Sequence, residues 1–198
     1  MSDLAHLDHF FVSQRLTMMV NRYEIRAAAP DGSEGPVVAM AQQKRMAFKE
    51  QVTFYADEDR KQAAFGFRAR RRIDLGATYD VTDADGQPIG WFRKQFGRSL
   101  LRSTWEMSTL DGGQVTGSER SAGVAIARRL WEVLPVVENL PSPFLFHFDF
   151  TDASGQVVMS SVRKRSLRDR YEITVPGGRV DGRVAAAMAV ALDALQSR

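Results

Sequence analysis

The feature that most constrains the fold is an uninterrupted apolar run near the end of the chain, residues 184–192 (Val-Ala-Ala-Ala-Met-Ala-Val-Ala-Leu). Ala, Met and Leu favour the α-helix, and the run follows a helix breaker, Pro-Gly-Gly, at 176–178. A helix that is apolar on every side must be enclosed by protein or by lipid. Spanning a bilayer takes about 20 residues, and this run has nine. The sequence therefore predicts a helix enclosed by protein, followed by a polar end from Asp193 onward.

A loosely repeated unit supplies the strands that would enclose this helix. Its clearest copies span 79–107 and 146–175, and a weaker copy spans 23–55. Each copy reads as a strand, a turn containing Gly, a strand that ends in basic residues, and a third strand. The alternation at 146–150 (Phe-His-Phe-Asp-Phe) is typical of a half-buried strand, and Gly provides the positive φ that tight hairpins require. Repeated hairpins favour an antiparallel sheet that closes into a barrel.

Length and composition fit one globular domain. The chain has 198 residues, of which 44% are hydrophobic and 26% charged, and this is enough for one sizeable core. We therefore expect 1–198 to form a single domain, with a short extra helix near 121–133 that stops at Pro135. Cysteine is absent, and the first residues lack the layout of a signal peptide. We expect a cytoplasmic protein without a transmembrane segment, with peripheral membrane attachment as an option.

The order of several motifs resembles a known family. The chain contains 79–86 (Tyr-Asp-Val-Thr-Asp-Ala-Asp-Gly), then 89–94 (Ile-Gly-Trp-Phe-Arg-Lys), then a Trp-Glu pair at 105–106, a Phe-x-Phe strand and the apolar helix. This order resembles the LURP-one-related and phospholipid scramblase-like families, which share the Tubby C-terminal fold. The resemblance implies a closed antiparallel β-barrel of about twelve strands around a central hydrophobic C-terminal helix. The helix residues expected at its centre are Val184, Met188, Val190 and Leu192.

The sequence contains no convincing catalytic or metal-binding pattern. Where scramblases have an acidic calcium-binding stretch, residues 175–183 contain one acid and two arginines. Ser161 and Lys164 match the Ser-x-x-Lys pattern of some acyl enzymes, but residues three apart on a strand lie on opposite faces. The acids at 80–85 suit a hairpin turn better than a calcium loop, because the required Glu would fall at Phe92. We predict no catalytic residue, no metal and no cofactor, and hence a non-catalytic binding protein.

Basic clusters are the one feature that points to a partner. The chain has 22 Arg and 5 Lys with a net charge of +3, and 60–72 contains six basic residues and no acid. Two further clusters fall at equivalent points of the repeat, so we expect them to meet on one rim of the barrel. Such a rim would attract phosphate groups. The predicted anion-binding residues are Arg93, Lys94, Arg98, Arg102, Arg163, Lys164, Arg165 and Arg168.

The leading hypothesis is binding of anionic phospholipid or of a phosphorylated head group at this rim. Four alternatives remain. The barrel could have a small-ligand pocket or an enzyme site, if its lumen is open and lined by convergent polar groups. The cations could be solvated strand ends that protect sheet edges. The domain could be a regulatory or structural module that binds another protein. It could also bind nucleic acid, with Trp91, Phe92 and Phe96 stacking on bases. The same aromatic residues would suit a lipid interface, although the simplest expectation places Trp91 in the core.

Overall fold

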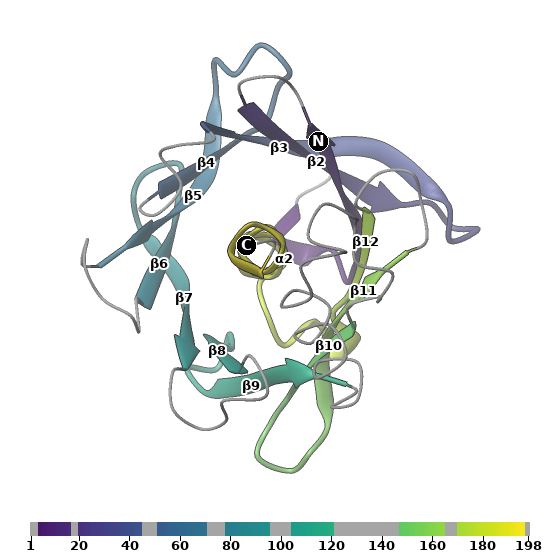
Figure 1. Cartoon of the computed structure of the whole chain (residues 1–198), viewed down its shortest axis with the longest axis vertical. Helices are drawn as coiled ribbons and strands as arrows, with labels where there is room; N and C mark the ends of the chain where they lie inside the picture. The colour runs from purple at the N-terminus through teal and green to yellow at the C-terminus, as the bar shows by residue number, and fades with distance from the viewer. Residues whose placement is uncertain are drawn as a thin grey trace, which may run out of the picture.

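The computed structural model describes residues 4–16, 20–44, 51–70, 78–95, 104–120, 147–164 and 170–196. Within these ranges the chain forms one closed antiparallel barrel with a helix along its centre (Figure 1). Neighbouring strands follow one another in chain order, and the first strand pairs with the last to close the barrel. The predicted barrel with its enclosed helix is confirmed, whereas the short helix predicted near 121–133 lies outside the described residues.

The barrel is built from twelve strands in the described part of the chain. They are β1 (His9–Leu16), β2 (Val20–Ala28), β3 (Glu34–Lys44), β4 (Gln51–Tyr55), β5 (Ala63–Ala69), β6 (Thr78–Asp83), β7 (Pro88–Gln95), β8 (Thr104–Ser108), β9 (Gln114–Glu119), β10 (His147–Thr151), β11 (Val157–Arg163) and β12 (Arg170–Thr174). Two 3-10 turns, η1 (Leu4–His6) and η2 (Pro176–Gly178), flank the sheet in sequence, and the helix α2 (Gly182–Gln196) follows.

Alternate residues of each strand point into the barrel and form an aromatic lining around α2. Phe54 stacks on Phe65 with ring centroids 4.2 Å apart. Farther along the lining, Phe92 contacts the rings of Phe67 and Tyr79 at 5.2 and 5.1 Å. Each of these five side chains is no more than 6% exposed. Because the residues between them point outward, every strand presents one face to the core and one to the exterior.

The central helix is buried along nearly its whole length. Val184, Met188 and Val190 are at most 1% exposed and Leu192 is 5% exposed, so the predicted central residues are confirmed. The helix is longer than the apolar run. The prediction of a polar end from Asp193 onward is wrong at that residue, because Asp193 lies within α2 and is only 5% exposed.

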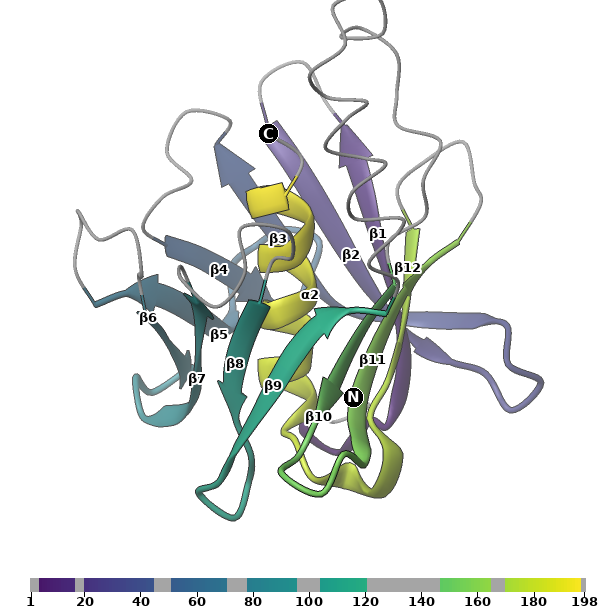
Figure 2. The ribbon, with the colours of Figure 1, turned by 60° about the horizontal axis from the view of Figure 1, so that its bottom comes forward.

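The two ends of the barrel differ. Five hairpin turns, at 29–33, 56–62, 84–87, 109–113 and 152–156, lie at the end where α2 begins, and this is called the turn end. Four of these turns contain a glycine with φ between +79° and +83°, as the Asp-Gly and Ser-Gly pairs predict. The opposite end, where β5, β7 and β11 finish and α2 ends, is called the rim. Figure 2 shows α2 running from the turn end to the rim.

Candidate functional site

Carboxylates gather at the turn end of the barrel. When the third turn is extended by one residue to include Asp83, the five turns contain eight carboxylates and two cations among the described residues. Each turn has an aspartate that accepts backbone N–H groups of the same turn: Asp31, Asp57, Asp83, Asp111 and Asp152. Hydrogen bonds from Ser33 hold the pKa of Asp31 below its ordinary value of 3.8, and those from Thr109 and Gly113 do the same for the pKa of Asp111. The turn end is therefore anionic at neutral pH.

Cations gather at the rim. Ten cations whose side chains are described lie within three residues of the rim end of a strand, against five carboxylates in the same positions. The cations are Arg15, Arg22, Arg68, Arg70, Arg93, Lys94, Arg120, Arg163, Lys164 and Arg170. The second strand of each repeat ends in basic residues. Because all of these strands finish at the same end of the antiparallel barrel, the repeat concentrates positive charge there.

The predicted pair at the end of β7 is split between the two faces of the wall. Arg93 pairs in register with Glu106 on the outer face, and its Nε lies 2.5 Å from the Glu106 carboxylate. Lys94 pairs in register with Trp105, which is fully buried, and its ammonium lies 5.8 Å from the Trp105 ring centroid. Lys94 is therefore on the inner face, toward the lumen.

The predicted pair at the end of β11 is split in the same way. Arg163 pairs in register with Tyr171, whose side chain is in the core. Lys164 binds the carboxylate of Glu172 on the outer face. This hydrogen bond, with a second from His9 at 2.9 Å, holds the pKa of Glu172 below its ordinary value of 4.5. On each strand one predicted cation faces outward and bears an acidic partner, while its neighbour faces inward.

The two predicted clusters share one end of the barrel but not one spot on its wall. Three strands, β8, β9 and β10, separate β7 from β11, which corresponds to roughly 19 Å along the sheet. The remaining predicted residues, Arg98, Arg102, Arg165 and Arg168, lie outside the described residues. At the rim, the predicted cations that lie within the described residues therefore form an arc of positive charge, not one compact pocket.

The expectation that Trp91 belongs to the core is wrong. Trp91 pairs in register with Asp80 and is partly exposed, and the Arg93 guanidinium carbon lies 5.6 Å from its ring centroid. Phe92, the next residue, fills the core position instead. The wall therefore presents an aromatic ring and a stacked arginine on its outer face.

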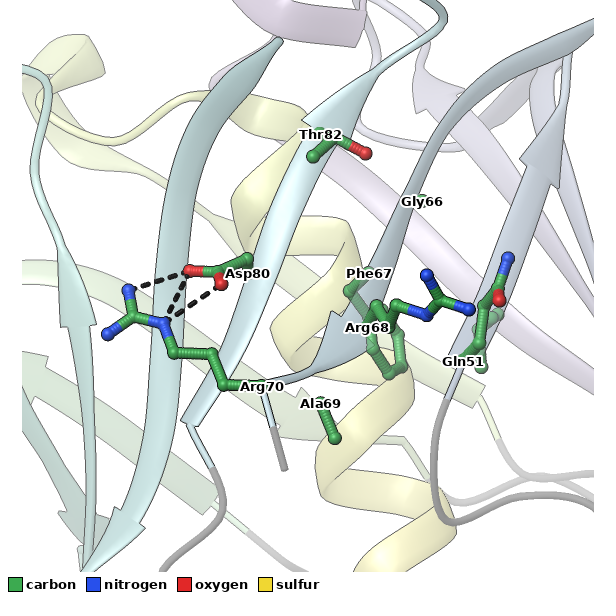
Figure 3. Close-up of a pocket in the computed structure, with 9 residues that line it drawn as sticks. Gln51, Gly66, Phe67, Arg68, Ala69, Arg70, Asp80 and Thr82 are labelled. Carbon is green, nitrogen blue, oxygen red and sulfur yellow. Dashed lines mark hydrogen bonds and ion pairs between the residues drawn. The ribbon is translucent and has the colours of Figure 1, made fainter. Parts of the chain in front are cut away.

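A hollow of about 410 Å³ lies on the wall where β4, β5 and β6 run side by side. The residues around it include Gln51, Gly66, Arg68, Arg70, Asp80 and Thr82 (Figure 3). The Arg70 guanidinium binds both carboxylate oxygens of Asp80, at 2.7 to 2.9 Å, and this contact raises the pKa of Arg70. The Arg68 side chain points the other way, toward Gln51.

Sequence reasoning found the basic run at 60–72 but not this hollow. The run alone does not show that Arg70 is neutralised while Arg68 is not, because Asp80 joins the site only through pairing of β5 with β6. The contribution of Gln51 likewise depends on pairing of β4 with β5. The alternation of the β5 sequence gave the one available signal, since it places Gly66, Arg68 and Arg70 on the same face.

Among the described ranges, no group of three or more His, Asp or Glu side chains is arranged to bind a metal ion. In the same part of the chain, no helix has both the length and the apolarity that crossing a bilayer would require.

Comparison with known proteins assigns the chain to a family. A search of curated proteins returned none that matches the chain. The model of the LURP-one-related family matches residues 37–193, which extend from β3 to α2 and include the hollow, the rim ends of β7 and β11, and the central helix. The match covers well over half of the chain, and the chain belongs to the LURP-one-related family.

Proposed function

We propose that this protein binds anionic phospholipid surfaces peripherally, with its rim facing the lipid. The observation that supports the proposal is the charge polarity of the barrel, with cations in excess at the rim and carboxylates in excess at the turn end. A negatively charged surface would attract the rim and repel the turn end. The same field would orient the molecule before contact, because summed surface charges steer association.

The filled lumen supports binding on the outside. The side chains of α2 from Val184 to Ala191 are at most 1% exposed, so the helix occupies the space in which many barrels bind ligands. The end of a barrel is a ring of strand termini, and such a ring can meet a flat surface at several points together. A Lys or Arg close to an anionic membrane contributes about 1 kcal/mol, and cations already paired with a carboxylate contribute less.

Arg22 and Arg68 are the rim cations best placed to act in this way. Both are exposed, and neither has a carboxylate within ion-pair distance among the described residues. Membership in the LURP-one-related family supports a Tubby-like barrel class. We further propose that residues 1–198 act as one domain, without catalytic activity, as a cytoplasmic protein that attaches to membranes reversibly.

Co-sedimentation with vesicles tests this function. We expect recovery with phosphatidylcholine vesicles that contain phosphatidylserine, little recovery with phosphatidylcholine alone, and loss of binding as salt screens the charges. Arg22→Gln at the rim should weaken binding about fivefold, from loss of about 1 kcal/mol. Arg60→Gln is the matched control, because it removes from the turn end one exposed arginine that has no carboxylate of the described residues in ion-pair contact. Equal recovery with both vesicle types, or equal weakening by both variants, would refute the proposal.

A further inference from the structure

The hollow on the outer wall follows from the register of three strands. Gly66 of β5 pairs with Thr53 of β4 on one side and with Thr82 of β6 on the other. A Cβ at Gly66 would lie 2.8 Å from the carbonyl oxygen of Val52, closer than a Cβ approaches a backbone oxygen. The position therefore excludes a side chain, and the wall is hollowed between two threonines.

The next row of cross-strand partners toward the rim sets the charge of the hollow. Arg68 pairs in register with Gln51 on β4 and with Asp80 on β6. Asp80 does not bind this direct partner. It binds Arg70 through both carboxylate oxygens, and Arg70 is two residues farther along β5. Arg68 is left exposed, turned toward Gln51, with no carboxylate of the described residues in ion-pair contact (Figure 3).

We infer that this hollow binds an oxyanion bearing a single negative charge, such as a phosphodiester or a carboxylate, and that Asp80 sets this limit. The Arg68 guanidinium offers two parallel N–H donors to a pair of oxygens, a geometry that suits both groups. The amide of Gln51 lies beside this guanidinium and can donate as well, and the hydroxyl of Thr82 adds a donor at the far side of the hollow, next to Gly66 (Figure 3). Where the oxyanion belongs to a lipid, the inference rests on the proposed function, and where it is soluble, the inference stands without it.

The limit of one charge follows from the groups around the hollow. Arg68 contributes one positive charge, while Arg70 and Asp80 neutralise each other. A ligand with one negative charge makes the net charge of the occupied hollow zero. A phosphomonoester has about two negative charges near pH 8, and its second charge would find no unpaired cation in the hollow, because Asp80 holds Arg70 through both carboxylate oxygens. A second charge that loses hydration without gaining a cation costs free energy, so we expect a phosphomonoester to bind about tenfold more weakly than a singly charged ligand.

Titration with soluble probes tests the site, with the side-chain N–H signals of the arginines followed by NMR. We expect dimethyl phosphate and acetate to shift the Arg68 signal of the wild type, and methyl phosphate at about pH 8 to bind more weakly at the same ionic strength. Arg68→Gln should abolish binding of dimethyl phosphate, which is followed in this variant by the backbone N–H signals around the hollow. Arg22→Gln is the matched control and should preserve it, because Arg22 is an exposed arginine on β2, away from the hollow.

Asp80→Asn is the decisive variant. It releases Arg70 and raises the charge of the hollow by one, so affinity for methyl phosphate should rise about tenfold, with less change for dimethyl phosphate. Asp80 is 39% exposed, so the variant is expected to fold, and Asp80→Ser offers a second way to remove the charge. No shift of Arg68 with either singly charged probe would overturn the inference. A preference for methyl phosphate in the wild type would overturn it as well.

Vesicles containing phosphatidylglycerol, which has one phosphodiester charge, identify the source of the oxyanion. If a lipid supplies it, Arg68→Gln should weaken vesicle binding well beyond Arg22→Gln, and dimethyl phosphate should compete. Equal effects of the two variants, together with a clear dimethyl phosphate shift, assign the hollow to a soluble oxyanion. Failure of the proposed function appears differently, as a wild type that binds dimethyl phosphate at Arg68 but sediments with no vesicle.

Discussion

Asp193 joins the central helix to the wall from inside the barrel. Its carboxylate accepts hydrogen bonds from the hydroxyls of Tyr23 on β2, at 2.9 Å, and Tyr171 on β12, at 2.5 Å. The amide of Gln14 on β1 donates to the Tyr23 oxygen at 3.3 Å. None of these four side chains is more than 8% exposed. We predict that Asp193→Ala destabilises the fold, because both hydroxyls lose their acceptor at a site with little access to water.

The size of the effect follows from these two hydrogen bonds. A buried donor left without its acceptor costs about 1 to 3 kcal/mol, so two such donors give a loss of about 4 kcal/mol. Domains of this kind have a free energy of unfolding of about 5 to 15 kcal/mol in total. Asp193→Asn retains one acceptor oxygen and should cost about half as much. Tyr171→Phe should cost about 1 kcal/mol in the wild type and almost nothing in the Asp193→Ala background.

Urea unfolding followed by tryptophan fluorescence measures these differences, since Trp105 is fully buried in the fold. The slope of the free energy against urea should stay constant across the series, so that each midpoint shift reports stability. A double-mutant cycle between Asp193 and Tyr171 should give a coupling energy of about 1 kcal/mol. Two results would refute the reasoning: a loss below about 1 kcal/mol for Asp193→Ala, or additive effects of the two substitutions.

Three further predictions address the core and the surface. Met188→Asp should prevent folding, as judged by circular dichroism, since it buries an unpaired charge in the lumen, whereas Met188→Leu should fold. Gly117→Val should lower the free energy of unfolding by about 3 kcal/mol, because its Cβ would lie 2.3 Å from the ring of Phe150; an unchanged urea midpoint would contradict this. The hydrogen bond from Arg120 holds the pKa of Asp149 below 3.8, so this pair stabilises the fold at neutral pH and the effect is lost as the carboxylate protonates at lower pH. The stability gap between wild type and Arg120→Gln should therefore close below pH 3.8, and a gap that persists there would contradict the assignment.

The central helix could be predicted because its evidence is local. Nine consecutive apolar residues leave few environments open, and Val184 and Met188 lie where that argument places them. Asp193 could not be understood in the same way. A carboxylate after an apolar run suggests a solvated helix end, and only closure of the barrel brings Tyr23 and Tyr171, from two distant strands, to its oxygens.

The site could be predicted in part. What could not be predicted is which residues lie next to each other across neighbouring strands. The repeat places basic residues at one set of strand ends, and this can be seen from the sequence. Alternation alone also requires Arg93 and Lys94 to face opposite ways. It does not say which of them faces outward, because Trp91 and Phe92 are both suitable core residues, and register with β6 and β8 decides between them. The hollow depends on the pairing of Gln51, Arg68 and Asp80 across three strands.

Closure of the barrel between β1 and β12 has a consequence for synthesis of the protein. The contact of His9 with Glu172 joins residues 163 positions apart, and α2 emerges from the ribosome only after β12. Until then the growing chain has strands with apolar inner faces and nothing to cover them. Contacts so distant in sequence slow folding, and exposed apolar strands aggregate. The nascent chain should therefore need chaperone protection until the helix is made.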